Sequence, residues 1–149
     1  MSDLTLTSPA FADGEPIPQR HTCRGKGSVP DLRWSGVPEG ADSLALVVSD
    51  PDAPRGTFIH WVLYDLAPSV TGLPRGAVPA GAREAANSAG TEGWYPPCPP
   101  RGTHRYVFTL YALGSSVAAT RGGDTRAVIA DIARRAIASA TLTGLVAAG

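Results

Sequence analysis

The sequence predicts a single mainly β domain, built as an antiparallel β-sandwich with Greek-key connections and one or two short helices. Runs of apolar and aromatic residues alternate with Gly and Pro, which together make up about a fifth of the 149 residues. A single segment shows helical spacing of apolar residues. Neither an internal repeat nor a linker divides the chain, so we expect residues 1–149 to form one domain.

Three strand-like runs are expected to form the core of the sheets. The first, residues 43–49, is nearly all apolar and stops at Asp50-Pro51, which is typical of a central strand buried on both faces. The second run covers residues 58–64 and the third covers residues 105–113. Gly and Pro flank these runs, which is the usual punctuation between strands.

One helix is expected near the C-terminus. Asp124 is a good N-cap, and the turn before it is indicated by Gly122-Gly123. The apolar residues that follow have the spacing of one helix face, at Ile129, Ile132, Ala133 and Ala136. The same pattern predicts a helix end near Ser139, and residues 140–146 are a candidate for a last strand.

Charge and hydropathy exclude two classes of partner. The chain has 13 Lys and Arg against 13 Asp and Glu, so no net charge attracts nucleic acid or an acidic membrane surface. No apolar stretch is long enough for a transmembrane helix. Residues 1–8 lack the basic and apolar parts of a secretory signal, so a cytoplasmic location is expected.

Two cysteines, Cys23 and Cys98, lie 75 positions apart. This spacing matches neither a zinc site nor a thioredoxin-like redox pair, and it leaves open one disulfide or two free thiols. In a chain without an export signal, reduced thiols are the default expectation. We expect no cofactor and no metal site.

Polar side chains gather at the ends of the predicted strands. His60 and His104 lie near the starts of two strands, and Tyr106 shares a strand face with His104. Asp50 and Asp52 share a face if the chain stays extended between them. Each residue alone has an ordinary structural explanation, as a turn, a buried imidazole or a half-buried aromatic ring. Together they predict a polar pocket for a small anion, in which the carboxylates orient a histidine.

The run Pro96-Pro97-Cys98-Pro99-Pro100 lies shortly before His104. Proline fixes φ and removes the backbone donor at four of these five positions, so the segment is rigid. It fits two interpretations, an extended edge that covers the core or the rim of a ligand pocket.

Two ordered motifs carry a family resemblance. The first is Asp50-Pro51-Asp52-Ala53-Pro54 followed by His60-Trp61, and the second runs from Pro99 through His104 to Phe108. Further matching positions are Cys23, Trp34-Ser35-Gly36-Val37-Pro38 and the closing segment 138–144. With nearly the whole chain covered, the sequence resembles the phosphatidylethanolamine-binding proteins, in their bacterial branch of Raf kinase inhibitor-like proteins.

This resemblance implies a β-sandwich with a small anion pocket at one end. The positions that match the family's pocket residues are Asp50, Asp52, His60, Pro99, Pro100, His104 and Tyr106, with Cys98 alongside. The family binds phosphate-bearing head groups or similar anions and is not known for enzymatic turnover. Its bacterial members pair, which implies a homodimer. Tyr95 and Pro96 stand where relatives often carry glycines, and Pro96 has no N–H to offer a ligand.

The leading hypothesis is a binding module for phosphate or a phosphoethanolamine-like head group that regulates or inhibits a protein partner, such as a kinase or protease, without enzymatic activity. The alternative is a metal-dependent hydrolase, with metal ligands drawn from Asp50, Asp52, His60 and His104. A third interpretation is a structural interaction domain whose polar rim has no ligand. The first is preferred over a metal site because strong metal sites usually have tighter sequence spacing. It is preferred over a nucleophilic hydrolase because Cys98 is the one candidate nucleophile near the pocket, and the prolines around it remove amides that an oxyanion hole needs.

Overall fold

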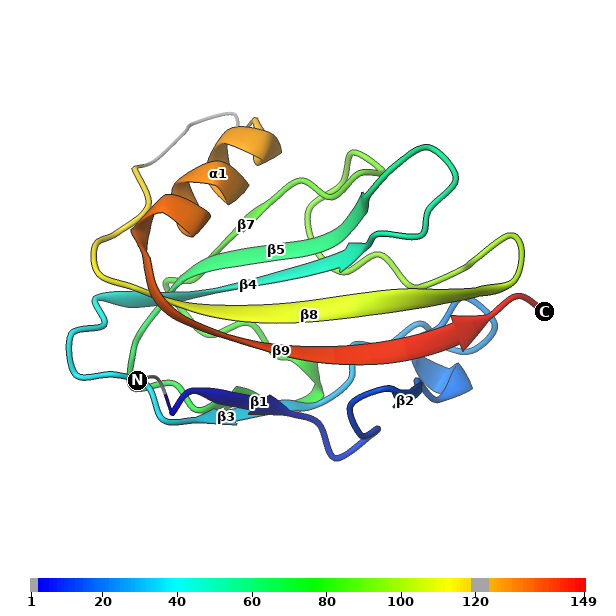
Figure 1. Ribbon diagram of the computed structural model, residues 1–149, viewed down its shortest axis with the longest axis horizontal. Helices are drawn as coiled ribbons and strands as arrows, with labels where there is room; N and C mark the ends of the chain where they lie inside the picture. Colours follow the sequence, from blue (N-terminus) through cyan, green and yellow to red (C-terminus); the bar gives the residue numbers. More distant parts are fainter. Residues whose placement is uncertain (1–2, 119–123) are drawn as a thin grey trace.

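The computed structural model describes residues 3–118 and 124–149 and shows two β-sheets and one α-helix (Figure 1). The predicted turn at Gly122-Gly123 lies outside these residues. The small sheet has the order β1-β3-β6, formed by Thr5–Thr7, Leu32–Ser35 and Gly72–Leu73. The large sheet has the order β2-β9-β8-β4-β5-β7, formed by Glu15–Pro16, Ala136–Ala147, Thr103–Leu113, Ser43–Asp50, Phe58–Leu66 and Arg83–Ala85. Helix α1 covers Thr125–Arg135, and two short 3₁₀ turns, η1 and η2, cover Gln19–His21 and Pro74–Gly76.

The three predicted core strands are confirmed as β4, β5 and β8. Strand β4 is buried on both faces, as its apolar run predicts, because the two faces contact different partners. Leu44, Leu46 and Val48 pack in the core shared with the small sheet. Ala45 and Val47 pack in a second core beneath α1. The period of two along a strand therefore divides one apolar run between two cores.

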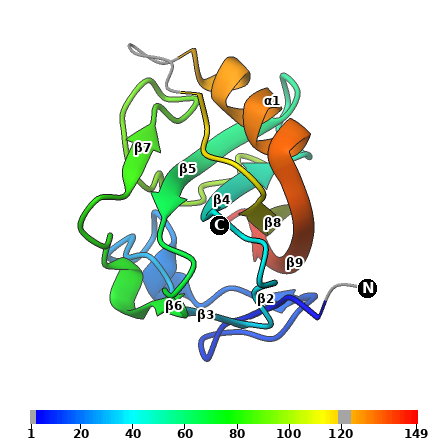
Figure 2. The ribbon, with the colours of Figure 1, turned by 90° about the vertical axis from the view of Figure 1, so that its left-hand side faces the viewer.

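The two cores lie on opposite sides of the large sheet. Figure 2 shows the molecule end-on, with α1 over one face of this sheet and β3 and β6 beneath the other. The core between the sheets includes Trp34 of β3, Trp61 of β5 and Phe108 of β8. The core under the helix contains Val128 and Ile132. Buried polar residues lie at the end of β4 and at the start of β8, at Asp50 and His104.

The predicted N-cap of α1 is confirmed, since the Asp124 side chain accepts a hydrogen bond from the Arg126 amide at 3.1 Å. The predicted end near Ser139 is wrong, because the helix ends at Arg135 and β9 begins at the next residue. Strand β9 pairs with β8 from Ala136 to Ala147, so it includes and extends the predicted last strand. This pairing overrides the weak local preference of an Ala-rich segment for helix.

The expectation of purely antiparallel sheets is wrong at one edge. Strand β2 pairs in parallel with β9, with Glu15 opposite Gly144 and Pro16 opposite Leu145. Gly144 makes this approach possible, because a Cβ there would collide with the side chain of Ile17. A strand of two residues has no periodic signal that sequence reasoning can detect. The Greek-key description of the connections stays a prediction.

The expectation of reduced thiols is also wrong, because Cys23 and Cys98 form a disulfide with their Cα atoms 5.4 Å apart. The Cys23 amide donates to the Pro97 carbonyl at 3.0 Å beside it. Two coil segments that are far apart in sequence are thereby joined at one end of the large sheet. In the described parts of the chain, no helix combines the length and the apolar character that crossing a bilayer requires.

Candidate anion site at the strand ends

A cavity of about 210 Å³ opens where β4 ends and β5 and β8 begin. Asp50 is the last residue of β4, and His104 is the second residue of β8. These strands are antiparallel neighbours, so the end of one meets the start of the other. His60 reaches the same cavity from β5, on the other side of β4. Sheet topology thus gathers residues that are up to 54 positions apart.

Seven of the eight predicted site residues line this cavity, namely Asp50, His60, Cys98, Pro99, Pro100, His104 and Tyr106. Asp52 is not among the lining residues. The sequence analysis missed four further residues of the wall, which are Ala53, Pro54, Phe58 and Tyr95. Phe58 lies two positions before His60 on β5, so the period of a strand could have found it. Tyr95 lies in coil and carries no periodic signal.

The Asp50 carboxylate organises one side of the cavity. His104 donates from Nδ1 to Asp50 Oδ2 at 2.6 Å, and both side chains are buried. The other carboxylate oxygen, Oδ1, accepts from the Asp52 amide at 2.8 Å. Burial raises the pKa of the Tyr106 phenol, and the charge of Asp50 and a hydrogen bond to it raise that pKa further. Tyr106 is therefore a protonated phenol at neutral pH.

His60 is held in one tautomer by the backbone of Tyr95. Its Nδ1 donates to the Tyr95 carbonyl at 2.7 Å, while the Tyr95 amide donates to the His60 carbonyl at 2.9 Å. The ring packs between Phe58 and Tyr106, with centroid distances of 4.7 and 5.1 Å. Burial lowers the pKa of His60. The neutral ring therefore presents Nε2 as a bare acceptor.

Asp52 has a different environment from Asp50. Both of its oxygens bind the Arg105 guanidinium, at 2.8 and 3.0 Å, and Oδ2 also accepts from the Arg105 amide at 2.9 Å. These hydrogen bonds hold the pKa of Asp52 well below its usual range. The strand ends at Asp50 and the chain turns, so the prediction of an extended chain from Asp50 to Asp52 is wrong.

The carboxylate of Asp52 is thus engaged by a cation outside the cavity wall. Among residues 3–118 and 124–149, no group of three or more His, Cys, Asp or Glu side chains is arranged to hold a metal ion.

The proline-rich segment forms the rim of the cavity, which supports the second of its two interpretations. The disulfide anchors Cys98, and Pro96 packs against Gly27 on the opposite coil. Gly27 has φ +68°, and a Cβ at this position would lie 2.7 Å from Pro96 Cγ. The rim is therefore fixed by a covalent bond and by close packing of the Pro96 ring on Gly27.

The chain is similar to known proteins in sequence and in structure. The family model described as "Phosphatidylethanolamine-binding protein" matches residues 7–147. The chain is 43% identical over 143 residues to LppC of Mycobacterium tuberculosis, which is named as a candidate lipoprotein, covering 95% of this chain and 71% of LppC. It is 40% identical to a UPF0098 protein of Methanothermobacter thermautotrophicus, covering 95% of this chain and 97% of that protein.

Two solved structures are similar along their whole length. CT736 of Chlamydia trachomatis, solved as a homologue of phosphatidylethanolamine-binding proteins, superposes with a TM-score of 0.92 at 39% identity and covers 100% of both chains. YbcL of E. coli, described as a member of the same family, superposes with a TM-score of 0.91 at 31% identity, covering 99% of this chain and 100% of YbcL. The chain therefore belongs to the phosphatidylethanolamine-binding protein family.

Proposed function

We propose that the cavity binds a small phosphate-bearing anion, such as inorganic phosphate or a phosphoethanolamine-like head group. The observation that carries the proposal is the arrangement of two buried imidazoles in one cavity wall. In both His60 and His104, Nδ1 is engaged by a neighbour, so Nε2 is the nitrogen that each ring can offer to a ligand.

The two imidazoles have different neighbours and favour a ligand that is protonated on one side. His104 Nδ1 is paired with the Asp50 carboxylate, so Nε2 is the ring nitrogen left for an oxyanion. Neutral His60 offers a lone pair and needs a donor from the ligand. A singly protonated phosphate has both groups, since its P–OH can donate and its other oxygens accept. Phosphate groups have a pKa near 6, so this form is available near neutral pH.

The size of the cavity also favours a small anion. A volume of about 210 Å³ is below the ~300–1,000 Å³ of typical sites for drug-sized molecules. The cavity therefore suits a phosphate or a head group, and it is too small to enclose the acyl chains of a lipid.

Calorimetry with inorganic phosphate and with phosphoethanolamine tests the proposal. We expect modest affinity that falls at least tenfold in His60→Ala and in His104→Ala, since each variant removes one ligand contact. Arg126→Gln, on the exposed face of α1, is the matched control and should bind like the wild type. Affinity for phosphoethanolamine should rise as pH drops from about 8 toward 6, because more of its phosphate then carries the P–OH that neutral His60 accepts. Equal heats for the wild type and both histidine variants would remove the site.

We also propose that this site performs no enzymatic turnover. The Cys98 sulfur is bonded to Cys23, so it is not available as a thiolate nucleophile in this state. We expect background rates with phosphate esters, carboxyl esters and peptides, with or without added Zn²⁺ or Mn²⁺. Saturable hydrolysis that disappears in His60→Ala would instead support a hydrolase.

Regulation of a protein partner, such as a kinase or protease, and assembly as a homodimer are proposals that rest on the family resemblance. Light scattering at tens of micromolar should give twice the monomer mass of 15.4 kDa. Inhibition assays with candidate kinases and proteases, with and without phosphate, test the regulatory role. A cytoplasmic location stays a prediction, and the disulfide argues against it because disulfides are rare in that compartment.

A further inference from the structure

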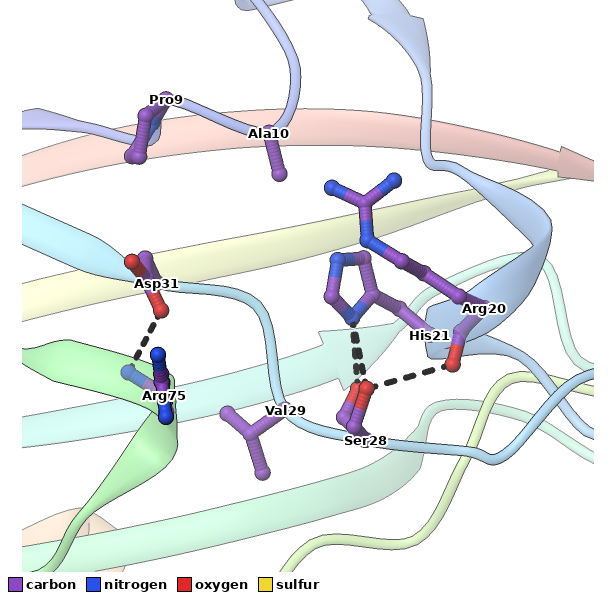
Figure 3. Close-up of a pocket in the computed structure, with 8 residues that line it drawn as sticks. All are labelled: Pro9, Ala10, Arg20, His21, Ser28, Val29, Asp31 and Arg75. Atoms are coloured by element: carbon purple, nitrogen blue, oxygen red, sulfur yellow. Dashed lines mark hydrogen bonds between the residues drawn. The ribbon is translucent and has the colours of Figure 1, made fainter.

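A second cavity, of about 450 Å³, lies beside the small sheet and shares no lining residue with the first. It is an open cavity, lined by the segment after β1, by η1, by the segment before β3 and by η2 (Figure 3). Its volume is within the ~300–1,000 Å³ range of small-molecule sites. Its polar lining comes from Arg20, His21, Ser28, Asp31 and Arg75.

His21 is a buried side chain with an unused hydrogen-bonding atom. The residue is 5% exposed, and its Nδ1 donates to the Ser28 carbonyl at 2.8 Å. The other ring nitrogen, Nε2, has no hydrogen-bond partner among the residues the structure describes. Burial lowers the pKa of His21, and the nearby charge of Arg20 lowers it further. The ring is thus neutral, with Nε2 as a buried acceptor, and leaving such an atom unpaired is unfavourable.

Charged groups of both signs surround this imidazole. In Figure 3 the Arg20 side chain extends alongside the His21 ring, and Asp31 and Arg75 face it across the cavity. Asp31 Oδ1 accepts from the Arg75 amide at 2.5 Å, and within the described chain its Oδ2 has no partner. Neither the Arg20 nor the Arg75 guanidinium forms an ion pair with any described residue. The cavity therefore offers two free guanidinium groups, one carboxylate oxygen and one imidazole acceptor.

The wall of the cavity is firmly built. Arg75 has φ +53°, a strained conformation that the hydrogen bond to Asp31 supports. The Asp31 carbonyl accepts from the Ser8 hydroxyl at 2.6 Å, which joins the segment before β3 to the segment after β1. Val29 packs directly on Gly76, where a Cβ would collide with it. The apolar lining lies on two sides of the cavity, with Pro9 and Ala10 on one side and Val29 on the other (Figure 3).

We propose that this second cavity binds a free amino acid with an aliphatic side chain. The carboxylate of such a ligand would pair with the guanidinium group of Arg20, which extends alongside the His21 ring. Its ammonium group would donate to His21 Nε2, the buried acceptor without a partner among the described residues. Its side chain would contact Pro9 and Ala10. A simple acid would leave His21 Nε2 unpaired, and a simple amine would leave Arg20 unpaired, so the zwitterion is the complementary ligand.

Nuclear magnetic resonance of the full chain tests this proposal with three matched probes. L-Valine carries both charged groups, 3-methylbutanoate lacks the amine, and isobutylamine lacks the acid. We expect valine to shift the His21 Nε2 resonance saturably and to bind at least tenfold tighter than either analogue. Equal affinity for valine and 3-methylbutanoate would overturn the zwitterion assignment. The absence of saturable shifts with all twenty protein amino acids would overturn the site.

Variants separate this cavity from the first one. Arg20→Gln changes an exposed side chain, so we expect a folded protein that binds valine about tenfold more weakly. Arg126→Gln and His60→Ala should bind valine like the wild type. If His60→Ala abolishes valine binding while Arg20→Gln leaves it unchanged, valine occupies the strand-end cavity and the proposal is wrong. Phosphate binding by Arg20→Gln should be normal, so failure of either proposal leaves the other testable.

Discussion

Removing the Cys23–Cys98 disulfide is expected to lower the free energy of unfolding by about 4.5 kcal/mol. The bond closes a loop with a sequence separation of 75 residues. In the chain-entropy description, cross-links that close loops of 15 and 100 residues contribute roughly 3 and 4.7 kcal/mol, so this loop corresponds to about 4.5 kcal/mol. The estimate concerns the unfolded chain, because the cross-link limits the conformations that the chain can adopt after unfolding.

Urea unfolding of the wild type and of Cys23→Ser/Cys98→Ser measures this difference. With a denaturant slope of about 2 kcal/mol per molar urea, a loss of about 4.5 kcal/mol lowers the midpoint by about 2 M. The wild type in reducing agent reaches the dithiol state by a second route and should unfold near the same midpoint as the double variant. Quantification of free thiols under non-reducing conditions is the control and should find none. A change below about 1 kcal/mol, or two titratable thiols in the native protein, would refute the reasoning.

Three further predictions concern pH, packing and the limits of the site. Burial lowers the pKa values of His21 and His60, so below pH 6.5 the unfolded state binds more protons than the folded state. The free energy of unfolding should therefore fall as the pH is lowered from about 7.5 to about 5.5, and an unchanged urea midpoint in phosphate-free buffer would contradict this. Phe108→Ala should cost ~3–5 kcal/mol in thermal or urea unfolding, since the ring is fully buried beside Phe11 and Trp94, and a loss below 1 kcal/mol would argue against this packing. Asp52→Asn should change phosphate affinity less than about twofold, because Asp52 lies outside the cavity wall; a tenfold loss in calorimetry would place it in the site.

The long strands and the main site residues could be predicted because their signals are local. The nearly apolar run of residues 43–49 identifies β4, and the period of two places His104 and Tyr106 on one face. Strand β1 has only Leu6 buried between exposed neighbours, so its alternation is too short to recognise. The boundary between α1 and β9 depends on pairing with β8, which an Ala-rich segment does not reveal.

The second cavity could not be predicted for a different reason. His21, Asp31 and Arg75 lie on three separate segments, and none of these segments has a periodic pattern. The decisive property of His21 is an unpaired buried nitrogen, which depends on the surrounding packing. Spacing in the sequence reports which residues share a strand face or a helix face. It does not report which coil segments come together.

The disulfide connects the walls of both cavities. Cys98 lines the first cavity, and Cys23 follows His21 of the second cavity by two residues. By contrast, the Asp50–His104 hydrogen bond joins two paired strands of the large sheet and does not depend on the cross-link. Reduction of the disulfide should therefore loosen the proline rim and the η1 segment, while Asp50 and His104 stay hydrogen-bonded to each other. It follows that the large sheet sets the charge arrangement of the first cavity, whereas the cross-linked coils set the shape of both.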